Sequence, residues 1–282
     1  SDEWIRSRTG IGARRVCGPG ESTGSLAVLA GREALDRSGV RPDDVDLVLV
    51  ATISPDQPWP ATAPWVAAEL EIPGGRAGAF DLSAACAGFV YGLDTAAAAI
   101  ETGRIDRALV IGADALTKQL DWTDRATCVL FGDGAGAVLL EAATDGRGLR
   151  STVLFSDGRG TKHLGLEVGG NRYRPGAPES EGRKDRIHQA GNEVYRFAVH
   201  AMPDACEKVM AKAGIVADDV DLFVPHQANI RIVTAAAERL GLPMEKVMTN
   251  MDRYGNTSAG SIPLALYEAE AAGRLKRGMT VV

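Results

Sequence analysis

The chain has 282 residues, of which 45% are hydrophobic, and this is enough for a large buried core. Its net charge of -6 argues against general nucleic-acid binding, which needs a basic face. The four cysteines are widely spaced and include no CxxC pair, so we expect no metal site and a reduced, cytoplasmic protein. No apolar run approaches the roughly 20 residues of a membrane span, so no membrane partner is expected.

Helices and strands are predicted to alternate in the first part of the chain. The pattern indicates an amphipathic helix over 23–38, a buried strand over 46–52, a Pro-rich loop over 53–64 and a helix ending near Leu70. A strand over 77–82, a helix over 87–102 and a strand over 107–112 follow, and 129–141 is predicted to be a pair of strands. This alternation predicts an α/β fold with parallel strand pairing.

The second part of the chain begins with a segment of different character. Residues 156–190 are rich in glycine, proline and charge, which is typical of a functional loop or a disordered one, and this loop could cover a site. Helices are then predicted over 192–213, 230–240 and 262–273, with strands over 221–224 and 246–251.

An internal repeat divides the chain into two copies of one unit. Gly39–Leu47 is matched by Gly214–Leu222, and Ile72-Pro73 by Leu242-Pro243. We therefore predict an N-terminal half over 1–155, a connecting loop over 156–190 and a C-terminal half over 191–282. The offset of Ile72 also places the end of the chain inside a strand that matches 109–111, so we expect the protein to continue further.

The repeat places different polar residues at matching positions. The residue that matches Cys86 is Asn256, and the residue that matches Ala51, at the end of a predicted strand, is His226. Both copies thus supply polar groups from strand ends and the turns that follow. This arrangement predicts an active site between the two copies.

Cys86 is the candidate nucleophile. It lies between a predicted strand and the first turn of a helix, where free N–H groups and the helix dipole favour the reactive thiolate. A lone cysteine is more often a buried structural residue, but the position of Cys86 and its match to Asn256 favour a nucleophile. We interpret the other three cysteines as structural: Cys17, Cys128 and Cys206.

His226 and Asn256 are the candidate partners of this nucleophile. His226 directly follows an apolar strand, and ligands bind at strand ends in α/β folds, although a histidine can also simply hydrogen-bond a turn. Asn256 alone would be an ordinary turn residue, and its interpretation as part of a site depends on Cys86 and His226. The nearby Gly132-Asp-Gly-Ala-Gly136 lacks the Lys-Ser/Thr of a phosphate loop, so we interpret it as close packing near a site.

Four short motifs surround these residues: Ala84–Phe89, Phe131–Gly136, Pro225–Asn229 and Gly255–Ser258. Together they resemble the β-ketoacyl-acyl-carrier-protein synthase III family of thiolase-like condensing enzymes. The resemblance covers essentially the whole chain and implies an α/β fold of two pseudo-repeated halves, with mixed sheets that sandwich helices in α-β-α-β-α layers. Elongating condensing enzymes use Cys-His-His and thiolases use a second cysteine, so Asn256 argues against both. Plant-type polyketide synthases share Cys-His-Asn, but the surrounding motifs fit synthase III better.

The resemblance implies a condensing reaction that starts type II fatty-acid synthesis. Cys86 would take an acyl group from acyl-CoA, and malonyl-acyl-carrier protein would then lose CO2 to give the carbanion that attacks the acyl group. His226 and Asn256 would stabilise the enolate, and the Cys86 N–H and a C-terminal Gly-rich loop beyond this sequence would hold the oxyanion. No cofactor is implied, because acyl-CoA is a substrate, and a homodimer is implied.

Further residues match positions of the family that bind substrate. Trp4 and Arg8 match a CoA-binding segment, and Trp4 and Arg125 would sandwich the adenine ring. Phe131 would line the acyl pocket, and Trp59 would reach into the acyl pocket of the partner subunit and restrict it to a short primer. The pantetheine channel and its mouth would be lined by Gly191, Asn192, Ala228, Asn229 and Arg231.

An acidic carrier protein would meet a basic patch at the channel mouth. Arg196 and Arg231 are the candidates, although two solvated arginines are the simpler interpretation. Two alternatives to fatty-acid synthesis stay open: a related acyltransferase or polyketide-priming enzyme of secondary metabolism, and a non-catalytic partner that binds acyl-CoA or scaffolds a dimer. The second would be expected to have lost at least one of the three catalytic side chains.

Overall fold

A four-stranded mixed sheet forms the centre of the first half. The computed structural model describes residues 1–282, and its strands are ordered β2-β1-β3-β4. β1 (Leu47–Ala51) runs parallel to β2 (Gly78–Leu82) and β3 (Arg107–Ala115), and β4 (Asp133–Glu141) runs antiparallel to β3. Every residue of β1 is buried, as expected for a central strand with helices on both faces.

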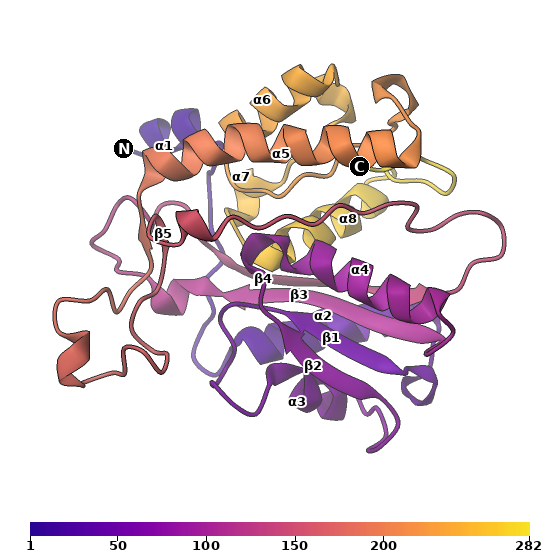
Figure 1. Cartoon of the computed structure of the whole chain (residues 1–282), viewed down its shortest axis with the longest axis horizontal. Helices are drawn as coiled ribbons and strands as arrows, with labels where there is room; N and C mark the ends of the chain where they lie inside the picture. Colours follow the sequence, from indigo (N-terminus) through magenta and orange to yellow (C-terminus); the bar gives the residue numbers. More distant parts are fainter.

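Helices cover both faces of this sheet (Figure 1). On one face, α2 (Thr23–Ser38) and α3 (Thr62–Glu69) pack with β1 and β3 in the largest apolar cluster. On the other face, α4 (Gly88–Glu101) and α8 (Ser261–Ala271) share a second cluster with these strands. The α2 helix has the predicted bounds, and the predicted helices at α3, α4 and α8 are confirmed to within two residues at the ends that were predicted.

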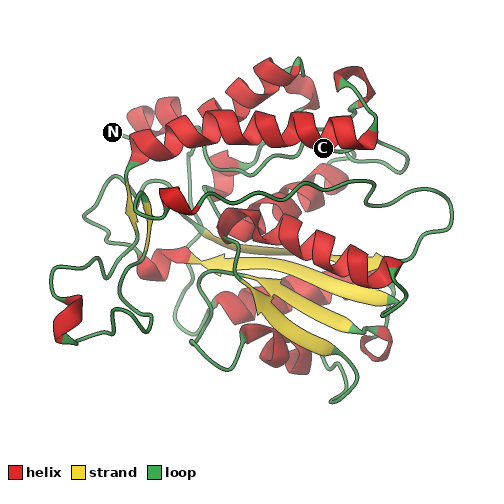
Figure 2. Cartoon of the chain, in the orientation of Figure 1, coloured by secondary structure: helices red, strands yellow, loops and turns green.

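The second half forms the remaining layers. Its segments around Leu222–Val224 and Met248 pack on α8, and α5 (Gly191–Ala213) and α6 (Ile230–Leu240) pack on their other side. The order of layers is therefore helix, sheet, helix, extended segments, helix, which agrees with the expected α-β-α-β-α arrangement (Figures 1 and 2). Helix α1 (Asp2–Thr9) also lies on this side of the molecule, against α6.

The strands predicted in the second half do not form ladders. The chain here makes only isolated bridges, which join Leu222 to Val281 and Phe223 to Val247. The prediction of a strand over 246–251 was wrong because Met251 already begins α7 (Met251–Tyr254). An apolar run indicates burial, but a ladder also needs neighbouring strands in register over several residues.

Two other predictions about the sheet were wrong. Residues 129–141 are one strand preceded by a turn, because Leu130 and Phe131 donate backbone hydrogen bonds to Thr127. The parallel pairing expected from the alternation holds for β1, β2 and β3 but fails for β4, in which Gly134 lies opposite Asp114. The sheet is therefore mixed, which confirms what the family resemblance implies.

The repeat is visible in the backbone of both halves. Gly39 and Gly214 end helices α2 and α5 with left-handed φ angles of 70° and 69°, which glycine adopts without strain. A short 3₁₀ turn with two aspartates follows each glycine. The first residues of the chain nevertheless pack on the second half, since Ile11 belongs to the cluster of α6. The proposed division into domains stays a prediction.

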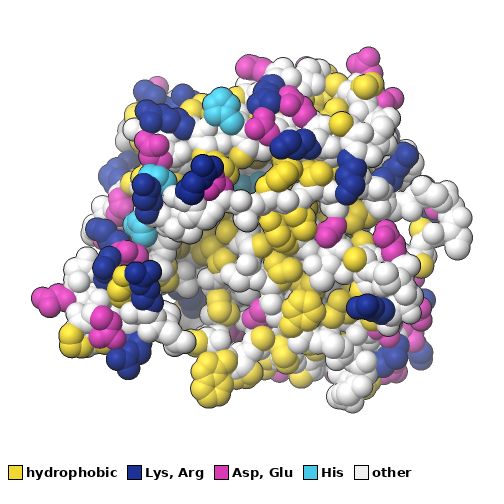
Figure 3. All heavy atoms as spheres, viewed as in Figure 1, with side chains coloured by type: hydrophobic (Ala, Val, Ile, Leu, Met, Phe, Trp, Pro, Cys, Tyr) yellow, Lys and Arg dark blue, Asp and Glu magenta, His cyan; other side chains and the backbone are white.

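The connection between the halves contains an extended segment, 149–157, that runs between α4 and α5 (Figure 1). Tyr91 of α4 donates a hydrogen bond to the Phe155 carbonyl at 2.8 Å, and Lys212 of α5 donates to the Thr152 carbonyl at 3.0 Å. The chain then makes an excursion closed by β5 (Leu164–Gly165) and β6 (His188–Gln189). Figure 3 shows hydrophobic side chains across the middle of this face, with charged groups mostly around them. None of the helices has the length and apolar character needed to cross a membrane.

Candidate active site

Cys86 lies in the turn that joins β2 to α4. The turn is a single 3₁₀ turn, Ala85–Ala87, and α4 begins at Gly88. Ala85 has a φ of 49°, an uncommon left-handed conformation for a residue with a side chain, and such strain is often found at active sites. Gly88 permits this close turn, because a Cβ there would lie 3.0 Å from the Cβ of Ala51.

The surroundings of Cys86 disfavour its thiolate. Burial and, to a smaller extent, the negative charge of Asp114 raise the pKa of the thiol to about 11, although Ser258 and a backbone N–H act in the opposite direction. The expectation that helix N–H groups hold Cys86 as a thiolate is therefore not met in the free protein, because the loss of water outweighs them. Cys86 rests as a thiol at neutral pH.

His226 follows the extended segment Leu222–Val224. Its Nδ1 lies 2.6 Å from the Ser261 hydroxyl at the start of α8. Burial lowers the pKa of His226 to about 4, so the ring is neutral at neutral pH. When Ser261 donates to Nδ1, the ring proton is on Nε2, and that nitrogen is a hydrogen-bond donor.

Asn256 is buried and fixed on both sides of its backbone. Its N–H donates to the Leu130 carbonyl at 2.9 Å, and its carbonyl accepts from Gly132 at 3.0 Å. Its side-chain oxygen accepts a hydrogen bond from the Ser258 N–H at 2.9 Å. The amide oxygen is thus occupied, and the NH2 group is the part of the side chain left to donate.

The segment Asn256–Ser261 connects the three candidate catalytic residues. Asn256 begins it, Ser258 lowers the pKa of the Cys86 thiol, and Ser261 contacts His226. The 3₁₀ turn Ser258–Gly260 packs directly against the turn that holds Cys86. The structure therefore brings the cysteine of one half and the histidine and asparagine of the other to a common place.

Glycines let the two halves approach closely at this place. A Cβ on Gly112 would lie 2.1 Å from the Ala259 carbonyl oxygen, and one on Gly132 would lie 2.3 Å from the Tyr254 carbonyl oxygen. One on Gly136 would lie 2.7 Å from the Leu264 backbone nitrogen. The interpretation of the Gly132–Gly136 motif as close packing is confirmed.

Asp114 is a buried carboxylate that sequence reasoning missed. Its Oδ1 accepts hydrogen bonds from Thr52 and from the backbone and hydroxyl of Ser54, among others, at 2.8–3.1 Å. Its Oδ2 accepts only a longer bond, 3.3 Å, from the Ala259 N–H. Burial raises the pKa of Asp114, and the hydrogen bonds oppose this effect. A charged residue inside an otherwise apolar strand was the available signal.

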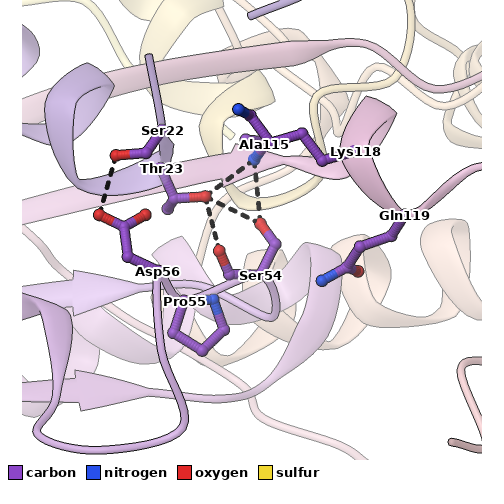
Figure 4. Close-up of a pocket in the computed structure, with 8 residues that line it drawn as sticks. All are labelled: Ser22, Thr23, Ser54, Pro55, Asp56, Ala115, Lys118 and Gln119. Atoms are coloured by element: carbon purple, nitrogen blue, oxygen red, sulfur yellow. Dashed lines mark hydrogen bonds between the residues drawn. The ribbon is translucent and has the colours of Figure 1, made fainter. Parts of the chain in front are cut away.

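The network continues from Asp114 to helix α2. Ser54 and Thr23 both accept from the Ala115 N–H, at 2.9 and 3.1 Å (Figure 4). A polar cavity of about 260 Å³ lies beside them, and none of the predicted site residues lines it. Its lining residues are Ser22, Thr23, Ser54, Pro55, Asp56, Ala115, Lys118 and Gln119.

Ser258 and Ser261 were also missed. Both follow Asn256 closely in the chain, but small polar residues are common in any tight turn, so the sequence offered no reason to single them out. The φ of 50° at Ser258 and the contact of Ser261 with a distant histidine become visible only in the structure. No group of three His, Cys, Asp or Glu side chains is arranged to hold a metal ion.

The predicted CoA-binding residues lie on exposed elements. Trp4, 51% exposed, and Arg8 are on α1, and Arg125 is exposed in the turn before β4. The sandwich of an adenine ring between Trp4 and Arg125 stays a prediction. Gly191 and Asn192 begin α5 and are exposed.

The remaining predicted residues have local contacts of their own. Asn229 caps α6 by accepting from the Arg231 N–H at 2.9 Å, and the Arg231 guanidinium lies 5.0 Å from the centre of the Tyr195 ring. Ala228, just before this cap, is half-buried. Arg196 pairs with Glu193 at 2.9 Å on the exposed face of α5.

Phe131 and Trp59 differ sharply in exposure. Phe131 is buried in a cluster with Leu116, Leu120 and Ile187, and it bridges to Asn256. Trp59 is 83% exposed on the loop between β1 and α3, and the bond to Pro60 is cis. Phe131 therefore lies directly beside Asn256.

The layered halves and the site between them define a condensing enzyme with a thiolase-like fold. A family model described as 3-oxoacyl-[acyl-carrier-protein] synthase III matches residues 80–158, and its C-terminal counterpart matches residues 210–282. A β-ketoacyl-[acyl-carrier-protein] synthase III of Symbiobacterium thermophilum is 50% identical over all of this chain and 85% of its own length. This chain belongs to the β-ketoacyl-[acyl-carrier-protein] synthase III family.

Solved structures agree with this assignment. The crystal structure of β-ketoacyl-[acyl-carrier-protein] synthase III from Thermus thermophilus has a TM-score of 0.92 and 47% identity, over 100% of this chain and 85% of that one. The priming β-ketosynthase of the R1128 polyketide biosynthetic pathway also has a TM-score of 0.92, with 37% identity over 100% of this chain and 83% of that one.

Proposed function

We propose that this protein initiates type II fatty-acid synthesis by joining an acyl group from acyl-CoA to malonyl-acyl-carrier protein. The products are 3-oxoacyl-acyl-carrier protein, CO2 and CoA. Membership of the synthase III family supports this reaction. The observation that carries it is the meeting of Cys86, His226 and Asn256 around one segment of the second half.

In the first step, the Cys86 sulfur attacks the thioester carbonyl of acyl-CoA. The thiol has a pKa of about 11, so its proton must leave as the carbon–sulfur bond forms. The carbonyl becomes a tetrahedral oxyanion, which then collapses, and CoA departs as a thiol after taking up a proton. The Cys86 N–H, in the turn before α4, is one donor for the oxyanion.

In the second step, neutral donors stabilise the charge that forms when malonyl loses CO2. The pKa of His226, about 4, keeps the ring neutral, and Ser261 leaves its Nε2–H as the donor. The side-chain oxygen of Asn256 is held by Ser258, so its NH2 group is the second donor. Each donor to such an enolate is typically worth about 3 kcal/mol. The carbanion then attacks the acyl group on Cys86, and the sulfur leaves.

We assign substrate-binding roles to the exposed residues around this centre. Trp4 and Arg125 hold adenine, and Arg8 lies in the same CoA-binding segment. The channel for pantetheine is lined by Gly191, Asn192, Ala228, Asn229 and Arg231. Acyl-CoA serves as substrate, and no resident cofactor takes part.

The acidic carrier protein docks near α5 and α6. Arg231 and Arg196 are exposed there, which supports this docking site. Arg231 is the stronger candidate, because Arg196 already pairs with Glu193.

The enzyme works as a homodimer in the cytoplasm. Strand β2 is at the edge of the sheet with one side unpaired, and edge strands are common sites of pairing between chains. Trp59, on a loop of the same half, enters the acyl pocket of the partner subunit, where it limits the primer to a short acyl group. All four cysteines are free, which suits a reducing compartment.

A second candidate function is the priming of a polyketide pathway. The likeness to the R1128 priming β-ketosynthase supports it, because that structure is as similar in fold as the Thermus thermophilus enzyme. The same Cys86, His226 and Asn256 would serve, and only the carrier protein would differ.

The test is to incubate the enzyme with acyl-CoAs from acetyl to long-chain and to measure the mass of the intact protein and its peptides. We expect a short acyl adduct on the Cys86 peptide that is absent in Cys86→Ala. Trp59→Ala should extend the range to longer chains, and an unchanged range would remove the assigned role of Trp59. If no acyl-CoA labels Cys86, CoA-primed condensation is wrong.

A further inference from the structure

The buried turn Ser258–Gly260 places a serine hydroxyl between the nucleophile and a buried carboxylate. Ser258 is completely buried, and its hydroxyl makes no hydrogen bond of ordinary geometry. Its turn packs directly against the turn that holds Cys86, and the next residue, Ala259, donates its N–H to Asp114 Oδ2 at 3.3 Å. In keeping with this position, Ser258 lowers the pKa of both Cys86 and Asp114. Ser258 therefore lies where the segments of these two groups meet, and its hydroxyl has no hydrogen-bond partner.

The backbone holds Ser258 in this place. Its φ of 50° is a left-handed conformation that residues with side chains rarely adopt. The neighbouring Ala259 donates to Asp114 Oδ2 and presses its carbonyl oxygen against Gly112. A residue kept buried, strained and unpaired beside a nucleophile is better explained by function than by folding.

The hydrogen bonds of Asp114 leave room for a further donor on one oxygen only. Oδ1 accepts four bonds at 2.8–3.1 Å, whereas Oδ2 accepts a single bond of 3.3 Å. The Ser258 hydroxyl has one hydrogen and can donate it to Oδ2 or to the Cys86 sulfur, but not to both.

We propose that Ser258 is a catalytic residue whose hydroxyl donates to Asp114 while Cys86 holds its proton, and turns to the sulfur as negative charge develops there. This inference rests on the proposed function, in which the sulfur is charged twice: when it attacks acyl-CoA and when it leaves the product. Ser258 stabilises the sulfur on both occasions. Asp114 opposes this charge, and the resting nucleophile stays protonated.

Ser258 and Asp114 thus have opposite effects on the stability of the Cys86 thiolate, and both effects can be measured. Asp114 is the charged side chain that acts on the thiol, and His226, the other titratable group of the site, is neutral above its pKa of about 4. At pH 8 the rate of alkylation is proportional to the small fraction of thiolate. Removing the donor should lower this rate, and removing the negative charge should raise it.

The experiment measures iodoacetamide alkylation of the Cys86 peptide by mass spectrometry in the whole enzyme at pH 8, with the melting temperature of each variant. We expect Ser258→Ala and Ser258→Gly to react about 10-fold more slowly, because a donor to the thiolate is lost, and Asp114→Asn to react about 10-fold faster, because a nearby negative charge is removed. Thr62→Val is the matched control, because Thr62 also has a buried hydroxyl without a partner and lies on α3. Its rate should not change.

Ser258→Ala and Ser258→Gly together distinguish the effect of losing the hydroxyl from the effect of backbone strain. Glycine adopts a φ of 50° without strain, so a defect in Ser258→Ala that Ser258→Gly restores would overturn the proposal in favour of backbone strain. Unchanged rates in both variants, or a shift of Asp114→Asn in the same direction, would also overturn it. If Asp114→Asn does not fold, the rates of the two Ser258 variants still test the proposal. Alkylation needs no acyl-CoA, so a failure of the proposed function would be seen separately, as absent acylation of Cys86.

Discussion

At the scale of single residues, burial decides the protonation state of the site. Cys86 and His226 both rest in their neutral forms, because each has a pKa moved away from neutrality by loss of water. A neutral histidine suits a donor to an enolate, since it can donate from Nε2 without carrying a charge into a buried site. The Cys86 thiol therefore keeps its proton until it attacks its substrate.

The lowered pKa of His226 predicts a loss of stability in mild acid. The unfolded chain binds a proton at His226 below about pH 6.5, whereas the folded protein does so only below about pH 4. The contribution of His226 is therefore complete above pH 6.5 and is lost as the pH falls towards 4. We expect the free energy of unfolding in urea to fall by about 2 to 3 kcal/mol more in the wild type than in His226→Gln over this range. Parallel curves for the two proteins would contradict the prediction.

At the scale of elements, the approach of the turn Ser258–Gly260 to strand β3 is the main determinant of the site. No side chain fits at Gly112, because its Cβ would meet the Ala259 carbonyl oxygen at 2.1 Å. The interface between the halves is therefore backbone against backbone. This contact holds the turn that carries Ser258, and Asn256 lies just before it.

Gly112→Ala should separate these elements. We expect a loss of roughly 1 to 3 kcal/mol in stability, as for other overpacked sites, together with a fall in condensing activity because Asn256 and Ser258 move. Thermal melting and a condensation assay with malonyl-acyl-carrier protein measure the two effects. Gly74→Ala is the control, since a Cβ at that position would have nothing within 4 Å, and it should change stability by less than about 0.5 kcal/mol. Equal stability of both variants would show that the contact tolerates a methyl group.

At the scale of the whole molecule, the edge of the sheet is the exposed feature that fits a second copy. Strand β2 has one unpaired side, and Phe80 in its middle is 41% exposed. An unpaired edge with an exposed aromatic side chain favours association, and a lysine at such a position opposes it.

Sedimentation should find a particle of twice the chain mass of 29.6 kDa. Phe80→Lys should shift it to the single chain mass, whereas Val216→Lys, which replaces an exposed apolar residue beyond the end of α5, should not. A dimeric Phe80→Lys would place the interface elsewhere, and a monomeric wild type would rule out the homodimer.

Local patterns predicted much of this protein, because a helix is encoded by neighbours in the chain. Helices α2 and α6 have the bounds that their apolar spacing predicts. The internal repeat matched Cys86 to Asn256 and placed His226 at a strand end, which indicated a site between the halves. The antiparallel β4 and the isolated bridges of the second half were missed, since pairing depends on which distant segment lies alongside.

The sequence by itself determined which side chains could react, because the type of residue and its place after a strand or before a helix are local properties. Only the tertiary structure decided their state. The pKa of the Cys86 thiol is raised by loss of water and by the charge of Asp114, although Asp114 is 28 residues further along the chain. Ser258 and Ser261 acquire their roles in the same way, from contacts with residues of distant segments. Desolvation and charge act through space, and the order of residues does not reveal them.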